Sequence, residues 1–252
     1  MHVLVTGAAR GIGRAIAEEF AGATLSLADL DGSLIPESLG FAITADLTGP
    51  AAPEEVVDRA WQRNGPIDVL VNAAGRYPSL DMIDVDAAAW DELFALNLRA
   101  PVLTTAAFAR RAAGRGGSVV NISSGAALRA RPGGGPYASS KAALEMATRA
   151  AALELGPLGI RVNAVSPGFV AVDSDRNPVA PDYAAAVSGN PLGRPGTPAD
   201  VARAVRWIAG EDASWITGEI LRVDGGSSAG AAHLPRLWPP QTVQSVQKGH
   251  NA

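Results

Sequence analysis

A tyrosine and a lysine four residues apart are the clearest pointer to chemistry in this sequence. Tyr137 and Lys141 stand near the start of a helical pattern, so their side chains project from one face, one turn apart. This spacing brings an ammonium group close to a phenol. A phenol titrates near 10, so a general base working near neutral pH needs its phenolate stabilised by about 3 pKa units, or about 4 kcal/mol. A neighbouring lysine supplies part of that stabilisation, which makes Tyr137 a candidate general acid or base.

A glycine-rich turn near the N-terminus predicts a dinucleotide site. Gly7, Gly11 and Gly13 follow the first apolar run and open the first helical pattern, where backbone N–H groups can approach a pyrophosphate at the positive helix end. Asp29 ends the second apolar run, where a carboxylate can bind both ribose hydroxyls and repels a 2′-phosphate. Arg10 acts in the opposite direction, because a guanidinium beside the turn can pair with that phosphate. The balance favours NAD over NADP as the cofactor.

Short apolar runs alternate with longer Ala-rich amphipathic stretches, a pattern typical of βαβ units around a parallel sheet. We therefore predict an α/β fold, a single doubly wound Rossmann-type domain with a seven-stranded parallel sheet and helices on both faces. The expected strands are His2 to Thr6, Thr24 to Ala28, Phe41 to Ala45, Asp68 to Asn72, Ser118 to Ile122, Ile160 to Val165 and Ile220 to Val223. The expected helices are Gly11 to Ala21, Pro53 to Arg63, Ala87 to Ala113, Tyr137 to Leu155 and Pro198 to Ala209, with Pro101 expected to interrupt the third.

Composition excludes several other classes of protein. The chain has 252 residues, of which 47% are hydrophobic and 18% charged, enough for a sizeable core. It has no cysteine and only three scattered histidines, so disulfides, thiol chemistry and a metal site are not expected. A net charge of -4 with dispersed basic residues argues against nucleic-acid binding. No signal peptide or membrane span is recognisable, and we expect a cytoplasmic enzyme.

The catalytic domain is expected to cover residues 1–226, with a substrate loop at about 169–198 and a C-terminal tail at 227–252. The loop and the tail break the strand-helix rhythm, and segments of that length are often lids or binding loops. We expect Leu234, Leu237 and Trp238 of the tail to dock on a neighbouring subunit near the substrate opening.

Several motifs in the right order make the chain similar to the short-chain dehydrogenase/reductase family over residues 2 to about 226. The cofactor motifs are the turn with Gly7, Gly11, Ile12 and Gly13, the pair Asp46 and Leu47, the segment Asn72-Ala73-Ala74-Gly75, and Pro167-Gly168-Phe169-Val170. The catalytic motifs are Asn97, Ser124 and Tyr137-Ala138-Ser139-Ser140-Lys141, and the late landmarks are Pro191-Leu192-Gly193-Arg194 and Val223-Asp224-Gly225-Gly226.

The resemblance implies a role for each matching residue. Tyr137 would exchange a proton with a carbonyl or alcohol oxygen, Ser124 would hydrogen-bond the same oxygen, and Lys141 would bind the nicotinamide ribose and lower the phenol pKa. Asn97 would anchor a water that links Lys141 to solvent. Ser123 competes with Ser124, which is preferred for its spacing of thirteen residues from the tyrosine.

The cofactor contacts implied by the resemblance are Gly7, Arg10, Gly11, Ile12, Gly13, Asp29, Asp46, Leu47, Asn72, Ala73, Gly75, Tyr137, Lys141, Pro167, Gly168 and Val170. One position departs from the family pattern. Val172 stands where the family usually has a threonine that touches the cofactor, so a hydroxyl contact is lost there.

These observations predict an NAD-dependent oxidoreductase that acts on a secondary alcohol or ketone. An NADPH-dependent ketoreductase is the alternative in the same class, and a non-catalytic nucleotide-binding sensor the alternative in another. Tyr77, Ala126 to Arg131 and Phe169 to Asn190 are expected to line the substrate pocket, with Arg129 or Arg131 able to meet an anionic substrate. The long Ala-rich helices favour a homodimer or homotetramer, since small side chains let helices approach closely.

Overall fold

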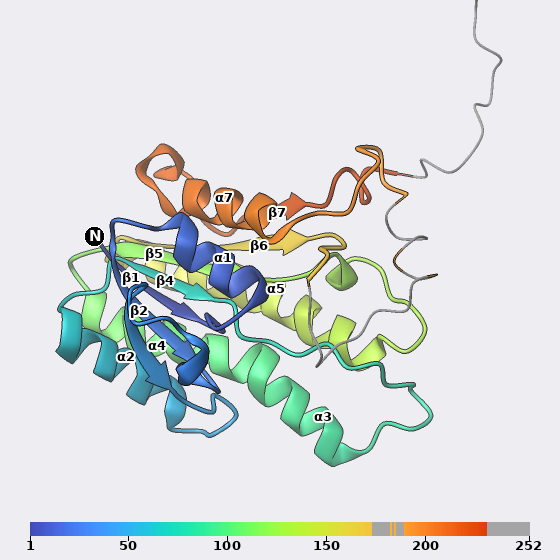
Figure 1. Ribbon diagram of the computed structural model, residues 1–252, viewed down its shortest axis with the longest axis horizontal. Coiled ribbons are helices and arrows are strands. Elements are labelled where there is room, and N and C mark those ends of the chain that lie inside the picture. Colours follow the sequence, from blue (N-terminus) through green and yellow to red (C-terminus); the bar gives the residue numbers. More distant parts are fainter. Residues whose placement is uncertain (173–181, 183, 185–188, 231–252) are drawn as a thin grey trace, which may run out of the picture.

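The computed structural model describes residues 1–172, 182, 184 and 189–230, and these form the predicted α/β domain (Figure 1). The tail residues Leu234, Leu237 and Trp238, and most of the segment 173–188, lie outside the described residues. Their expected roles stay predictions.

One parallel sheet runs through the molecule in the order β3-β2-β1-β4-β5-β6-β7. Its strands are β1 (His2–Thr6), β2 (Thr24–Asp29), β3 (Phe41–Thr44), β4 (Val69–Asn72), β5 (Gly117–Ile122), β6 (Ile160–Pro167) and β7 (Ile220–Val223). All seven predicted strands are confirmed, with ends shifted by a residue or two. The strand order reverses between β1 and β4, and ligands of doubly wound sheets bind at the carboxyl ends of the strands at such a point.

Both faces of the sheet are buried, which explains the unbroken apolar runs. Val3 and Val5 of β1 join a core cluster on one face, while Leu4 between them joins the cluster on the other. The helices α1 (Gly11–Glu19) and α7 (Pro198–Ala209) cover the first face. The second face is covered by α2 (Ala52–Asn64), α4 (Ala100–Ala112) and α5 (Gly135–Leu155), as Figure 1 shows.

The expected interruption of the helical stretch from Ala87 to Ala113 is confirmed, although it lies before the proline. The chain forms α3 (Ala87–Phe94), a π-helical turn at Ala95–Arg99 and then α4. The Ala100 N–H donates to the Ala95 carbonyl five residues back, and Pro101 has no N–H to donate to the Asn97 carbonyl. The interruption therefore lies one turn before the proline, and it contains Asn97.

The remaining short elements are 3₁₀ turns at Gly32–Leu34, Gly125–Ala127, Gly156–Leu158 and Glu211–Ala213. Among the described residues, no helix is long and apolar enough to cross a membrane, and no group of three His, Cys, Asp or Glu side chains is placed to hold a metal ion. The cytoplasmic location stays a prediction.

Candidate active site

The glycine-rich turn packs too closely for any side chain at two of its glycines. A Cβ on Gly7, whose φ is +68°, would lie 2.7 Å from the Ala74 backbone, and one on Gly13 would lie 2.0 Å from the Gly7 carbonyl oxygen. Gly11 has a φ of +56°, where an L side chain is strained. Within the described chain, the N-cap residue Arg10 makes no side-chain cap bond to the first turn of α1. The turn and the uncapped helix end thus fit a pyrophosphate, as the sequence predicts.

Side chains at the ends of β1 and β2 fix this turn in place. The Thr6 Oγ1 accepts hydrogen bonds from the N–H groups of Ala73 and Ala74, at 3.1 and 3.2 Å, which ties β1 to the chain after β4. The Asp29 Oδ2 accepts the Ala9 N–H at 2.9 Å, so the predicted ribose-binding carboxylate sits against the glycine turn. Thr6 begins the glycine-turn motif but is not among the predicted cofactor residues, and its two hydrogen bonds give it a place in the site.

The predicted general acid or base meets Ser124 and a second tyrosine. Tyr137, in the first turn of α5, has its hydroxyl near the side chain of Ser124 at the end of β5. Its ring packs edge-on against Tyr77, with the ring centroids 6.1 Å apart. Burial raises the pKa of Tyr137 above its ordinary value of 10, while the Ser124 hydrogen bond and the charge of Arg131 act to lower it. The site itself therefore does not ionise the phenol at neutral pH.

Lys141 lies one turn along α5 and is buried, only 5% exposed. Its Nζ donates to the Ile122 carbonyl at 2.8 Å and lies 6.0 Å from the centroid of the Tyr137 ring. Burial lowers its pKa from 10.5 to about 8. At pH 7 most molecules still carry the ammonium charge beside the phenol.

Asn97 is brought to the same place by the π-helical turn. Its Oδ1 accepts the Arg76 N–H at 2.9 Å, and its Nδ2 donates to the Arg76 carbonyl at 2.8 Å and to the Ser140 hydroxyl at 3.2 Å. A Cβ on Gly75 would lie 3.2 Å from the Asn97 Oδ1 and 3.6 Å from the Lys141 Nζ. Gly75 thus adjoins both polar groups, and Asn97, Ser124, Tyr137 and Lys141 form one cluster.

The two serines face different partners. Ser123 is buried and donates its hydroxyl to the Glu145 Oε1 at 2.8 Å. Ser124 instead lies near the Tyr137 hydroxyl. Ser124 as the catalytic serine stays a prediction.

Two predicted cofactor residues direct their side chains into the protein interior. The Asn72 Nδ2 donates to the Asn121 Oδ1 at 2.9 Å, and the Asn72 Oδ1 accepts the Thr104 hydroxyl at 2.7 Å. Leu47 belongs to the core and is 5% exposed. The side chains of both residues are thus taken up by the protein interior, and their backbones are the parts left for a cofactor contact, which stays a prediction. The buried amide network around Asn72 has no simple periodic signal in the sequence.

Asp46, next to Leu47, uses its carboxylate within its own turn. The Asp46 Oδ1 accepts both the N–H and the hydroxyl of Thr48, at 2.9 and 2.7 Å, and these bonds lower the pKa of Asp46. The residue is charged at neutral pH and lies after β3, as expected for the edge of the site.

The segment Pro167-Gly168-Phe169-Val170 leaves β6 at the same edge of the sheet. Val170 pairs with Gly196 in a parallel bridge, in which the Ala171 N–H donates to the Gly196 carbonyl at 3.0 Å and the Gly196 N–H donates to the Phe169 carbonyl at 2.9 Å. Val172, the position without the family threonine, has its Cγ1 3.6 Å from where a Gly11 Cβ would lie. The two predicted cofactor loops therefore face each other.

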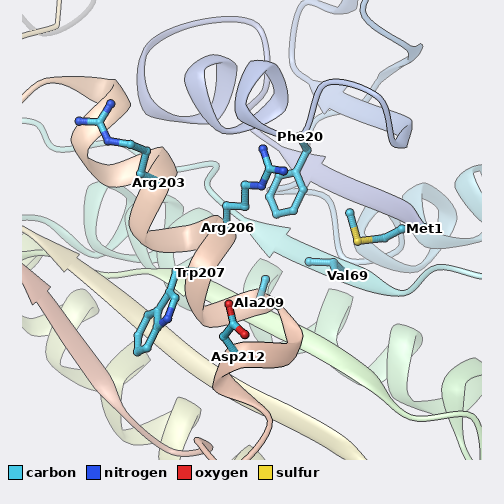
Figure 2. A pocket seen from close by; sticks show the side chains of 9 residues that line it. Met1, Phe20, Val69, Arg203, Arg206, Trp207, Ala209 and Asp212 are labelled. Carbon is cyan, nitrogen blue, oxygen red and sulfur yellow. The ribbon is translucent and has the colours of Figure 1, made fainter.

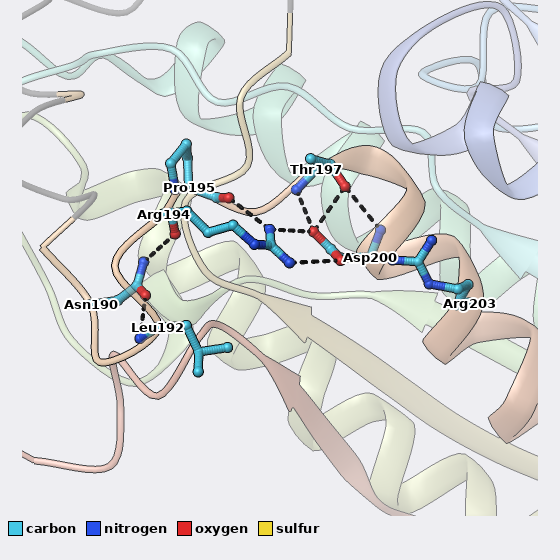
Figure 3. Close-up of polar contacts among 7 residues, drawn as sticks. All are labelled: Asn190, Leu192, Arg194, Pro195, Thr197, Asp200 and Arg203. Carbon is cyan, nitrogen blue, oxygen red and sulfur yellow. Dashed lines mark hydrogen bonds and ion pairs between the residues drawn. The ribbon is translucent and has the colours of Figure 1, made fainter.

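An ion pair holds the returning end of this loop, as Figure 3 shows. Arg194 donates from two nitrogens to the two Asp200 oxygens, at 2.8 and 3.1 Å. Thr197 and Asp200 also form a reciprocal capping box at the start of α7. The Arg194 hydrogen bond, followed by those of Thr197, holds the pKa of Asp200 far below its ordinary range. Arg194 and Asp200 thus fasten the segment that pairs with Val170.

A shallow cavity of about 370 Å³ lies at the opposite edge of the sheet, near the amino ends of β1 and β4 (Figure 2). It is lined by Met1, Phe20, Val69, Arg203, Arg206, Trp207, Ala209, Gly210 and Asp212. Arg203 is paired with Asp200, and Arg206 with Glu19, so these two charges already have partners. The chemistry of the Tyr137 cluster is absent from this lining, and we assign the cavity no role.

Comparison with known proteins supports the family resemblance. A family model described as Enoyl-(Acyl carrier protein) reductase matches residues 7–228. A 3-oxoacyl-[acyl-carrier-protein] reductase of Thermotoga maritima is 35% identical over 235 residues, which cover 88% of this chain and 96% of that protein.

Two solved structures share the fold over most of the chain. A blue fluorescent protein from a metagenomic library, in complex with NADPH, superposes with a TM-score of 0.81 at 35% identity and covers 89% of this chain and 96% of its own. A 7α-hydroxysteroid dehydrogenase, complexed with NADH and 7-oxo glycochenodeoxycholic acid, gives 0.85 at 31% identity and covers 89% and 93%. The chain belongs to the short-chain dehydrogenase/reductase family of oxidoreductases.

Proposed function

We propose that this protein is an NAD-dependent oxidoreductase that interconverts a secondary alcohol and a ketone, with Tyr137 as general acid or base. The observation that carries the proposal is the cluster itself. The Tyr137 hydroxyl lies near the Ser124 side chain, with the buried Lys141 ammonium one turn away, at the sheet edge where the glycine turn of α1 also ends.

The chain's own residues supply the proton chemistry. Ser124 and Tyr137 together hold the substrate oxygen, and Tyr137 donates a proton to it in ketone reduction or accepts one in alcohol oxidation. Lys141 places a positive charge near the phenol and so favours its ionised form. Asn97, beside Lys141 and held by the Arg76 backbone, is placed to orient a water that connects the lysine to solvent. The nicotinamide cofactor, when bound, accepts or supplies the hydride.

The preference for NAD rests on the place of Asp29. Its carboxylate accepts the Ala9 N–H and thus stands beside the turn that would receive the cofactor phosphates. A negative charge there binds ribose hydroxyls and repels a 2′-phosphate. Arg10, next to Ala9, supports NADPH as the second candidate, and one structural neighbour is an NADPH complex. Kinetics with the two cofactors decide between them.

The direct test is a substrate panel with NADH and NADPH, followed by the absorbance of the reduced nicotinamide. The panel contains acetoacetyl-CoA, ethyl acetoacetate, cyclohexanone and a 7-oxo bile acid. Turnover of at least one ketone, with NADH used better than NADPH, is the expected result. The non-catalytic sensor predicts cofactor binding by fluorescence with no turnover of any substrate, together with equal behaviour of wild type and Tyr137→Phe.

We also propose a homodimer or homotetramer that forms through α4 and α5. Val102 on α4 and Met146 and Leu153 on α5 are 42%, 63% and 81% exposed. Apolar side chains on Ala-rich helices favour close helix packing between subunits. Light scattering that gives a monomer mass would refute this assembly.

A further inference from the structure

Helix α5 contacts the end of β5 at three successive levels. Tyr137, Lys141 and Glu145 are spaced four residues apart, so they lie along one stripe of the helix. The first lies near the Ser124 side chain, the second donates to the Ile122 carbonyl, and the third accepts the Ser123 hydroxyl. The first two contacts belong to the proposed chemistry. The contact of Glu145 with Ser123 has no part in that chemistry.

The Glu145 contact lies in the protein interior. Glu145 is 8% exposed and Ser123 is 3% exposed, and the Ser123 Oγ lies 2.8 Å from the Glu145 Oε1. Removing a carboxylate from water is unfavourable unless hydrogen bonds compensate, and an apolar side chain would fill the same space without that penalty. The neighbouring Leu144 already packs in the interior at 1% exposure. Helix packing alone therefore does not explain an acidic residue at this position.

Ser123 is the residue between the two groups that the proposed active site uses on β5. On one side is Ile122, whose carbonyl oxygen holds the Lys141 Nζ, and on the other is Ser124, whose side chain lies near Tyr137. The Ser123 N–H donates to the Val165 carbonyl at 2.8 Å, which attaches this point to β6. Its hydroxyl attaches the same point to α5. The backbone that carries both groups is thus tied on two sides.

We propose, building on the function proposed above, that Glu145 is a positioning residue that sets the register of α5 on the end of β5. Through Ser123 it holds Ser124 against Tyr137 and the Ile122 carbonyl against Lys141. A displacement of reacting groups by about 1 Å can lower a rate by about 10²-fold, so loss of the Glu145–Ser123 contact can lower kcat strongly. Its role is geometric, because a neutral acceptor of the same shape can take the Ser123 hydrogen bond.

The test compares four variants, Glu145→Leu, Glu145→Gln, Ser123→Ala and the double variant Glu145→Leu/Ser123→Ala. The assay uses the panel ketone with the highest kcat/KM, and NADH affinity is measured by fluorescence. We expect Glu145→Leu and Ser123→Ala each to lower kcat by about 10-fold or more with NADH Kd within about threefold. The double variant should be no slower than the worse single variant, because both changes remove one contact. Glu145→Gln should keep kcat within about threefold, since its carbonyl oxygen still accepts the Ser123 hydroxyl.

Glu154→Leu is the matched control, because Glu154 is an exposed glutamate on the same helix. It should leave kcat and KM as in wild type. A merely structural role for Glu145 would lower the melting temperature of Glu145→Leu and leave kcat at 25 °C unchanged, which overturns the proposal. An electrostatic role would make Glu145→Gln as slow as Glu145→Leu, which also overturns it. If Glu145→Leu does not fold, Ser123→Ala decides, and wild-type kcat in that variant refutes the proposal.

Tyr137→Phe, measured in the same series, separates this inference from the proposed function. If Tyr137→Phe keeps its turnover, the assignment of the active site fails and the positioning role fails with it. If Tyr137→Phe is inactive while Ser123→Ala is fully active, the assigned active site stands and only the role of Glu145 is refuted.

Discussion

Tyr137→Phe is the most informative single change, because it removes one oxygen and keeps the ring. The ring packs edge-on against Tyr77 at a centroid distance of 6.1 Å, and phenylalanine can make the same contact. The Ser124 hydroxyl still accepts the Ala126 N–H at 3.2 Å, so it keeps its hydrogen bond. The variant should therefore fold and bind the cofactor with nearly wild-type affinity.

The expected rate loss follows from the proton that Tyr137 handles. Burial raises the pKa of Tyr137 above 10. Ionising its phenol at pH 7 in the free enzyme therefore costs more than about 4 kcal/mol, which corresponds to about 3 pKa units. A positioned general acid or base contributes about 10² to 10⁴ in rate, which corresponds to about 3 to 5 kcal/mol of barrier. We expect kcat to fall by at least about 10²-fold, with NADH Kd within about twofold.

The assay is steady-state ketone reduction, followed by the absorbance of the reduced nicotinamide, with a separate fluorescence titration of NADH. Tyr77→Phe is the matched control, because it removes a second phenol oxygen next to the same ring. It should alter KM more than kcat, since Tyr77 is expected to line the substrate pocket. If Tyr137→Phe retains more than about a tenth of wild-type kcat, the general acid-base role is refuted.

Four further changes test other parts of the structure. Asp29→Asn removes the charge and keeps an acceptor for the Ala9 N–H, so the ratio of kcat/KM for NADH over NADPH should fall; a wild-type preference for NADPH would refute the argument. Asp200→Ala removes the capping box of α7 and the partner of Arg194, and should lower the free energy of unfolding by about 1 to 2 kcal/mol in urea denaturation. An unchanged free energy of unfolding would contradict the stabilising role of the cap. Burial lowers the pKa of His2 below its ordinary value of 6.5, so the unfolded chain takes up the proton first and the stability that His2 contributes above pH 6.5 is lost as the pH falls. The melting temperature of wild type should therefore fall more between pH 7 and pH 5 than that of His2→Gln, and equal falls would disprove this. Deletion of residues 230–252 should lower oligomer stability or alter the substrate KM with NAD affinity unchanged, whereas identical mass, melting temperature and kinetics would exclude a docking role for the tail.

The sequence by itself determined the features that depend on near neighbours along the chain. The unbroken apolar run of β1 predicted a strand buried on both faces, and the glycines at 7, 11 and 13 predicted the turn into α1. The spacing of Tyr137 and Lys141 placed both on one face of α5. Helix and strand periodicity and the left-handed backbone of glycine arise from local sterics, so they can be read without knowing what packs against them.

Only the tertiary structure decided which groups meet across long separations in the chain. The Ser123 hydroxyl bonds to Glu145, 22 residues away, and the Thr6 hydroxyl bonds to the Ala73 N–H, 67 residues away. The Asn72 side chain is part of a buried network with Asn121 and Thr104. The fall of the Lys141 pKa to about 8 is also a result of burial by the whole fold. Local sequence rules do not contain this information, because burial and hydrogen-bond partners depend on how separate elements pack together.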